Sequence, residues 1–355
     1  MSKESDNLYL NIIIPNNVSS TNPYPQSIRA VYDESLVQPI LMDPSQYYAS
    51  IVRFSMPLDT IPFFSFPLDR NQNNPNVSQL LIGVKRAGVE YTRFVNYIPQ
   101  NDYPPPVTTT GTFSYDQSLL PYYFVYSIQP LITMINIALA SAFGAAGIAG
   151  AAPYYVYNPL TQLVSLIVTQ AFLTANATIF MNNYTKNYLD SFPFYTNVNY
   201  QDGAYKYTHN LDTIPYGSPV GGPYEFIEEY NSLDLWFDIR KIIITSSSFP
   251  VIPESTPSYN PDQSNGTNGS VTYAPIITDY VVSYNNINDV TSVLVYEPSP
   301  QYRLVNMSST SPINRLNFSF SWLSKNGSLY PVLLSPNNSI TIKLGFFKKD
   351  LYKHL

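Results

Sequence analysis

The sequence has no cysteine, few glycines and little charge. Of its 355 residues, 12% are charged, 14 are glycine and two are histidine. The absence of cysteine excludes disulfides, zinc–thiolate sites and thiol nucleophiles, and it is compatible with a reducing compartment. A histidine-based metal site or catalytic triad would rest on His209, because His354 stands at the end of the sequence. The polar segment around His209 predicts an exposed loop histidine.

Basic clusters are also scarce. The net charge is −6 and the pI is about 4.9. The one basic cluster is short, and it could be a solvated tail or a contact with an acidic neighbour; its members are Lys343, Lys348, Lys349 and Lys353. Nucleic-acid binding needs a denser basic surface, so we expect no direct contact with nucleic acid. The first residues lack the basic start and long apolar run of a signal peptide.

Aromatic residues and proline are abundant instead. The chain is 15% aromatic, with 32 tyrosines and 31 prolines. Tyrosine and β-branched residues favour strands, and proline favours turns and strand ends. Low charge with many aromatic residues is also typical of the cores of protein–protein interfaces. The composition therefore predicts a β-rich protein with extensive contacts to other proteins.

Short apolar runs bounded by turn residues predict strands in the first and last thirds. The run Ser78–Ile98 has a hairpin-like break at Arg86-Ala87-Gly88. The other predicted strands are Leu8–Ile14, Tyr47–Pro57, Leu233–Phe249, Pro275–Ser283, Ser292–Tyr296, Arg315–Trp322, Leu329–Leu334 and Ser339–Phe347. Strands at this spacing favour a β-sandwich or jelly roll.

The middle third differs, because no charged residue occurs between Asp116 and Lys186. Apolar residues at helical spacing predict a helix over Ile128–Phe143, followed by strands at Tyr154–Asn158 and Gln162–Val168. The uninterrupted helix is shorter than the roughly 20 residues that span a bilayer. A core helix under a small sheet is therefore favoured over a membrane span.

Evidence for catalysis is weak. Acidic residues cluster at Glu225, Glu228, Glu229, Asp234 and Asp238, a spacing that also fits a solvated segment. We find neither a glycine-rich phosphate loop nor a G-x-S-x-G elbow. The sequence thus predicts no enzyme, no cofactor, and no catalytic or metal-binding residue.

The stretch KIIITSSSFPV, residues Lys241–Val251, combines an apolar run with three consecutive serines and a proline. We interpret it as an edge-like strand whose terminal hydroxyls bond a neighbouring edge or turn. Pro250 lacks an N–H group, so it is expected to end the pairing.

Several segments carry a family resemblance, in the same order along the chain. The block LDLWFDIRKIIITSSSFPVIPE resembles one found in minor capsid, or penton, proteins of virophages and polinton-like viruses. Further pieces with the same resemblance are Tyr47–Phe64, Ser127–Phe143, Ile276–Tyr284 and Tyr302–Lys349. The last includes a KNG hairpin and an IKLGFFKK strand.

The resemblance implies a mainly β protein: a single jelly-roll β-sandwich with an inserted smaller α+β domain. The predicted ranges are 1–100 and 226–355 for the jelly roll and 101–225 for the insertion. It further implies a homopentamer at the five-fold vertices of an icosahedral virion, assembled in the host cytoplasm beside double jelly-roll major capsid trimers. The insertion would be free to touch a host surface. Expected interface contributors are the N-terminal segment, tyrosine-rich loops and Phe346–Leu355.

Two other hypotheses remain open. The first is a host-attachment or carbohydrate-binding β-sandwich that uses Tyr154, Tyr155 and Tyr195 as stacking platforms. The second is a glycoside hydrolase that pairs Glu225 or Glu228 with Asp234. The hydrolase requires two carboxyl groups within about 10 Å of each other across a cleft.

Overall fold

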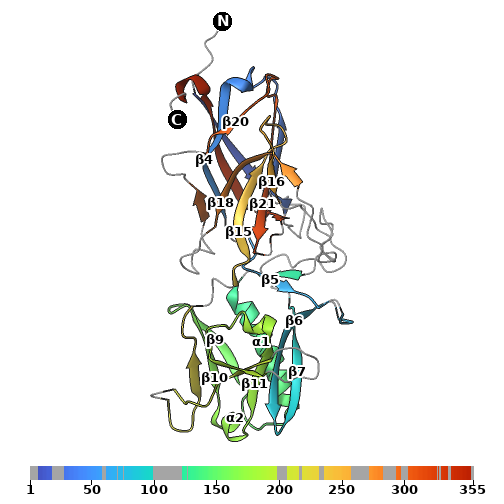
Figure 1. The fold of residues 1–355 in the computed structure, drawn as a ribbon, viewed down its shortest axis with the longest axis vertical. Coiled ribbons are helices and arrows are strands. Elements are labelled where there is room, and N and C mark those ends of the chain that lie inside the picture. The colour runs from blue at the N-terminus through green and yellow to red at the C-terminus, as the bar shows by residue number, and fades with distance from the viewer. Residues whose placement is uncertain are drawn as a thin grey trace. The chain divides into compact units, whose positions relative to one another are not determined.

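The chain folds into two compact units (Figure 1). The computed structural model describes residues 7–17, 28–57, 61–69, 71–74, 76–98, 122–125, 127–197, 206–215, 218–231, 236–256, 272–282, 293–296, 303–325, 327, 329–334 and 337–352. Of these, residues up to Ile61 and from Ile239 onwards form the jelly-roll unit, and those between Pro62 and Asp238 form the α+β unit.

Two antiparallel sheets build the jelly-roll unit. The β4 sheet has the order β1-β24-β4-β19, with β20 also paired to β4; its strands are β1 (Asn7–Pro15), β24 (Ser339–Lys348), β4 (Tyr47–Pro57), β19 (Val293–Tyr296) and β20 (Val305–Asn306). The β21 sheet has the order β18-β15-β21-β22, with β3 also paired to β21; its strands are β18 (Ile276–Val281), β15 (Ile239–Thr245), β21 (Arg315–Ser324), β22 (Leu329–Pro331) and β3 (Val31–Ser35). The predicted mainly β jelly-roll fold is thus confirmed.

Alternation along the strands places large apolar side chains between the two sheets. Phe54 on β4 stacks on Phe320 of β21 with ring centroids 5.8 Å apart, and it lies 5.3 Å from the ring of Tyr280 on β18. Phe54 and Phe320 are both completely buried. These contacts join the two sheets across one apolar core.

Strand β15 lies inside its sheet, so the prediction of an edge-like strand is wrong. It pairs with β18 on one side and with β21 on the other. Its run Ile242–Ile244 is buried, which is the continuous apolar pattern of a strand covered on both faces.

Two further sheets and one long helix form the α+β unit. The larger sheet has the order β12-β13-β11-β6-β7, made of β12 (Phe194–Asn197), β13 (Lys206–His209), β11 (Thr178–Asn182), β6 (Val77–Arg86) and β7 (Val89–Asn96). The smaller sheet has the order β14-β10-β9, made of β14 (Tyr224–Ile227), β10 (Leu163–Val168) and β9 (Tyr154–Asn158). The helices are α1 (Ile128–Ala145), α2 (Gln170–Thr174) and α3 (Asn183–Lys186).

The remaining elements are short. Three two-stranded pairs are β2 (Ile28–Arg29) with β23 (Leu333–Leu334), β5 (Phe64–Pro67) with β8 (Tyr122–Val125), and β16 (Glu254–Thr256) with β17 (Thr272–Ala274). Two 3-10 turns lie at Pro44–Gln46 and Lys349–Tyr352.

Helix α1 packs against β6, β7 and β9, as expected of the predicted core helix. The side chain of Asn136 donates to the carbonyl of Tyr155 at 2.8 Å and accepts from its N–H at 2.7 Å, which ties the helix to β9. Among the described residues, α1 is the one helix long and apolar enough to cross a membrane, and half of that stretch is buried within the protein.

The compact units differ from the predicted ranges of the jelly roll and its insertion. The prediction assigned residues up to 100 and from 226 to the jelly roll, whereas Pro62 onwards and the residues up to Asp238 belong to the α+β unit. Strand pairing explains the difference, because β6 pairs with β11 and β14 pairs with β10. These partners lie far from β6 and β14 in the sequence, so no local pattern reports the pairing.

Candidate functional site

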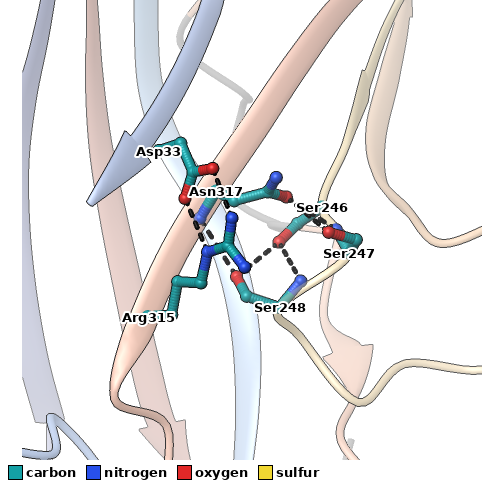
Figure 2. A network of polar contacts seen from close by, with 6 residues as sticks. All are labelled: Asp33, Ser246, Ser247, Ser248, Arg315 and Asn317. Atoms are coloured by element: carbon teal, nitrogen blue, oxygen red, sulfur yellow. Dashed lines mark hydrogen bonds and ion pairs between the residues drawn. The ribbon is translucent and has the colours of Figure 1, made fainter. Parts of the chain in front are cut away.

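The serine run forms a turn at the end of β15 that is bonded to β21 (Figure 2). The backbone N–H and the hydroxyl of Ser247 both donate to the side-chain oxygen of Asn317, at 2.8 and 3.0 Å. In return, the backbone N–H of Asn317 donates to the hydroxyl oxygen of Ser248 at 3.0 Å. The predicted hydroxyl contacts with a neighbouring strand are therefore confirmed.

Ser246 connects the same turn to the other side of β15. It is 1% exposed, and its N–H donates to the carbonyl of Pro275, directly before β18. Its hydroxyl oxygen accepts from the N–H of Ser248 at 3.3 Å and lies 3.0 Å from that residue's hydroxyl. The strand ends at Thr245, so the serine turn ends the pairing before Pro250 is reached.

An exposed ion pair lies beside this turn in Figure 2. Arg315 Nε donates to Asp33 Oδ1 at 2.6 Å, and a second guanidinium nitrogen contacts the other carboxylate oxygen. This hydrogen bond holds the pKa of Asp33 below its usual value. The pair links β3 to the first residue of β21.

Phe249 closes the core next to the turn. It is 3% exposed, and its ring meets Phe318 of β21 edge-on at 5.5 Å and Phe346 of β24 at 5.7 Å. Its contacts thus reach both sheets of the sandwich. After it, the carbonyl of Pro250 accepts from the N–H and the hydroxyl of Ser308. The serine turn and Phe249 together shape this end of the jelly roll, and their contacts describe a structural role.

His209 is buried in the α+β unit, so the prediction of an exposed loop histidine is wrong. Its Nε2 lies 2.6 Å from the hydroxyl of Tyr155, and the rings of Phe192 and Phe194 pack against it. Burial lowers the pKa of His209 to about 3, so the imidazole is neutral at physiological pH. The sequence carried no clear signal of this burial, because β13 has four residues and the neighbours Thr208 and His209 are both buried.

The acidic residues have unlike surroundings. Glu225 lies on β14 as an exposed residue between the buried Tyr224 and Phe226. Glu228 is 3% exposed, and its carboxylate accepts from the N–H of Val164 at 2.7 Å. Asp234 lies outside the described residues. Glu228 is therefore engaged in holding β10, and this arrangement gives no support to the hydrolase hypothesis. Within the described residues, no group of three acidic or histidine side chains could hold a metal ion.

The three tyrosines suggested as stacking platforms do not form one surface. Tyr154 is 44% exposed and Tyr195 is 47% exposed, whereas Tyr155 is 1% exposed and is held by His209. Tyr154 lies on β9 of the small sheet, and Tyr195 lies on β12 of the larger one. The hydroxyl of Tyr195 donates to Asp212 at 2.7 Å, and this bond raises the pKa of Tyr195.

The basic cluster is divided among separate contacts. The ammonium of Lys343 lies 5.2 Å from the centre of the Tyr9 ring. Lys349 donates to the carbonyls of Ser45 and Met307 and lies over the ring of Tyr48. Partial burial lowers the pKa of Lys349. Lys353 lies outside the described residues.

One expected group of interface residues lies inside the jelly-roll unit instead. Phe346 is completely buried and Phe347 is 2% exposed, so neither ring is available on the surface. Leu351, in the 3-10 turn that follows, is 55% exposed. Within the described part of Phe346–Leu355, Leu351 is therefore the exposed large apolar side chain that could meet another molecule.

Comparisons with known proteins agree with the jelly roll. The model of the family described as "Sputnik minor capsid protein V18/19" matches residues 8–349. Two proteins of Sputnik virophage are similar in sequence. "Uncharacterized protein V18" is 30% identical over 160 residues, 43% of this chain and 93% of that protein. "Structural protein V19" is 24% identical over 217 residues, 57% of this chain and 96% of that protein.

Two solved structures resemble almost the whole chain. A chain from the cryo-EM structure of Sputnik virophage matches 99% of this chain and 100% of its own length, with a TM-score of 0.78 and 26% identity. The crystal structure of the mavirus penton protein matches 97% of this chain and 99% of its own, with a TM-score of 0.65 and 19% identity, which shows a shared fold. The chain therefore belongs to the Sputnik minor capsid protein V18/19 family of virophage capsid proteins.

Proposed function

We propose that this minor capsid protein forms homopentameric pentons at the five-fold vertices of the virion. The observation that carries the proposal is the likeness, over 99% of the chain and at a TM-score of 0.78, to a chain of an assembled virophage particle. The likeness to a protein named as a penton supports the same position in the capsid. The jelly roll would build the vertex and carry the α+β unit as an insertion.

The proposed activity is assembly, without a chemical step. A five-membered ring needs a heterologous interface, in which one surface of each copy meets a different surface of the next. Permanent interfaces of this kind are large and apolar. A chain with 12% charged and 15% aromatic residues suits such contacts. Double jelly-roll major capsid trimers would be its neighbours around the vertex.

Mass photometry and negative-stain microscopy of the purified protein test this proposal. Rings of five copies are expected, with a mass about five times that of the 40.0 kDa chain. The same protein in a denaturing concentration of urea gives the monomer mass as a control. A protein that stays monomeric at every concentration, and forms no ring when co-expressed with the major capsid protein, would contradict the proposal.

A further inference from the structure

Exposed apolar side chains on the strands of the jelly-roll unit are confined to its outermost strands. Among the described residues of this unit, six large hydrophobic side chains on strands are at least 39% exposed: Tyr9, Ile13, Val31, Val281, Val293 and Val295. They lie on β1, β3, β18 and β19, which are edge strands in their sheets. The inner strands β24, β4, β15 and β21 contribute none. The exposed apolar side chains therefore lie along the two edges of the sandwich and do not cover the whole face of a sheet.

We divide these residues into two patches by the side of the sandwich on which their strands lie. The first patch, Tyr9, Ile13 and Val31, lies on β1 and β3. The two strands share one side of the sandwich: Asn16, just after β1, donates to the carbonyl of Leu334 at 2.8 Å. Leu334 belongs to β23, whose partner β2 leads directly into β3.

The second patch, Val281, Val293 and Val295, lies on β18 and β19 at the opposite side of the sandwich. The rings of Tyr280 on β18 and Tyr296 on β19 stack at 5.1 Å, which places these two strands together. Each sheet therefore ends in the first patch on one side and in the second patch on the other.

The register relates the patches directly. Ile13, Thr341, Ser55 and Val295 lie opposite one another in consecutive strands of the β4 sheet. The hydroxyls of Ser55 and Thr341 lie 2.7 Å apart in the middle of this row. The row is thus polar at its centre and apolar at both ends. Ile13 is 62% exposed and Val295 is 56% exposed.

Strand direction favours a second copy of this chain as the occupant. Every pairing along β1-β24-β4-β19 is antiparallel, so β1 and β19 run in opposite directions. The same holds for β3 and β18 across the β21 sheet. A neighbouring copy in a similar orientation therefore presents its first patch antiparallel to the second patch, on both sheets together.

The lack of charge on two edge strands also favours a second copy of this chain as the occupant. Free sheet edges in natural proteins are usually protected by charged side chains, especially lysine. Strands β1 (NLYLNIIIP) and β19 (VLVY) contain no charged residue. In the β4 sheet, both edges thus lack the usual protection and match each other in their β-branched, uncharged character, whereas β3 carries Asp33 and Glu34 and β18 carries Asp279.

We propose that the first patch of one copy packs on the second patch of the next copy, head to tail, around the ring. This inference rests on the proposed pentamer and names its interface. Because the two patches differ, each copy uses both of them, and the contact repeats until the ring closes. Ile13 and Val295 lie near the centre of the contact.

Two lysine variants test the pairing. Ile13→Lys should block the first patch, and Val295→Lys should block the second, so each variant alone should be monomeric. A mixture should give dimers that grow no further, because the intact second patch of the first variant meets the intact first patch of the other. The dissociation constant of a blocked contact should rise roughly tenfold to hundredfold, because losing the burial of one aliphatic side chain weakens binding by about this factor. Ile227→Lys, at an exposed residue of the α+β unit, is the matched control and should still form rings.

Cross-linking provides a second test, since the natural chain contains no cysteine. The double variant Ile13→Cys/Val295→Cys, treated with a short bismaleimide, should give a ladder that ends at five chains. Either single variant should give no ladder. Circular dichroism confirms that each variant is folded, which is expected because both side chains are exposed.

The outcomes separate the inference from the proposed function. If the wild-type protein forms rings and both lysine variants also do, or the cysteine pair gives no ladder within those rings, the interface is wrong and the pentamer stands. Dimers of Val295→Lys alone would indicate that the first patch pairs with itself, which also overturns the inference. If the wild-type protein forms no ring with or without the major capsid protein, both proposals fail.

Discussion

Phe249 is expected to carry much of the stability of the jelly-roll unit, and Phe249→Ala tests this. The side chain is 3% exposed and contacts Phe318 and Phe346, which belong to different sheets. Removing a buried phenylalanine ring costs about 3–5 kcal/mol, from lost burial and from the cavity left behind. Phe249→Leu keeps much of the apolar volume but loses the ring contacts, each worth about 0.5–1.5 kcal/mol. We therefore expect a loss of about 1–3 kcal/mol for leucine.

The assay uses the two tryptophans of the chain, one in each compact unit. Trp322 lies in β21 of the jelly roll and Trp236 in the α+β unit, and each is 1% exposed. Urea unfolding in a Trp236→Phe background reports the jelly roll through Trp322 fluorescence. The free energy of unfolding should fall in the order wild type, leucine, alanine. A loss below about 1 kcal/mol for alanine would refute the idea that Phe249 bridges the sheets.

Three further predictions concern other buried or crowded sites. Gly83→Ala should destabilise the α+β unit by about 1–3 kcal/mol in urea unfolding, because the new Cβ would lie 2.4 Å from Phe180 Cζ. As a control, Gly144→Ala should stabilise the same unit by up to about 1 kcal/mol, because Gly144 lies in α1 with open space around it. The depressed pKa of His209, about 3 against 6.5 when unfolded, should make that unit less stable as the pH falls from about 6.5 towards 3. His209→Gln should flatten this pH dependence, measured by Trp236 fluorescence. Asn317→Ala should cost about 1 kcal/mol by the Trp322 assay, since it removes two hydrogen bonds that water can partly replace.

Local patterns predicted those elements whose signal lies within one short segment. The strand Tyr47–Pro57 and the strand Tyr154–Asn158 have the predicted bounds, and the predicted helix is two residues longer. The break at Arg86-Ala87-Gly88 is a hairpin turn, in which Ala87 and Gly88 both have positive φ values of 49° and 82°. A positive φ suits glycine and gives the tight turn its twist.

Features that depend on distant partners could not be predicted. The short strands β11 to β14 have four or five residues each, too few to show a clear period. Lys241 and its neighbours suggested an edge strand, because nothing local shows that β18 and β21 arrive on both sides. His209 stands in a polar segment, and only the packing of Phe192 and Phe194 around it explains its burial.

The candidate surfaces likewise include features that the sequence predicted and features that it did not. The sequence predicted that the serines would bond a neighbouring strand, because hydroxyls at strand ends commonly do so. It did not identify the apolar edge residues Ile13 and Val295, since their exposure depends on which strands lie at the margins of each sheet. The segment Phe346–Leu355 was expected at an interface, yet alternation along β24 directs Phe346 into the core.

The amide of Asn136 has a consequence for the addition of a further strand at the edge of β9. By occupying both main-chain groups of Tyr155, it takes the place of a further strand at the outer margin of β9. The main-chain N–H and C=O groups of Tyr155 are therefore not available to pair with an extended segment of another chain. Uncontrolled fibre growth through this strand is thus disfavoured, although β9 is short, apolar and uncharged.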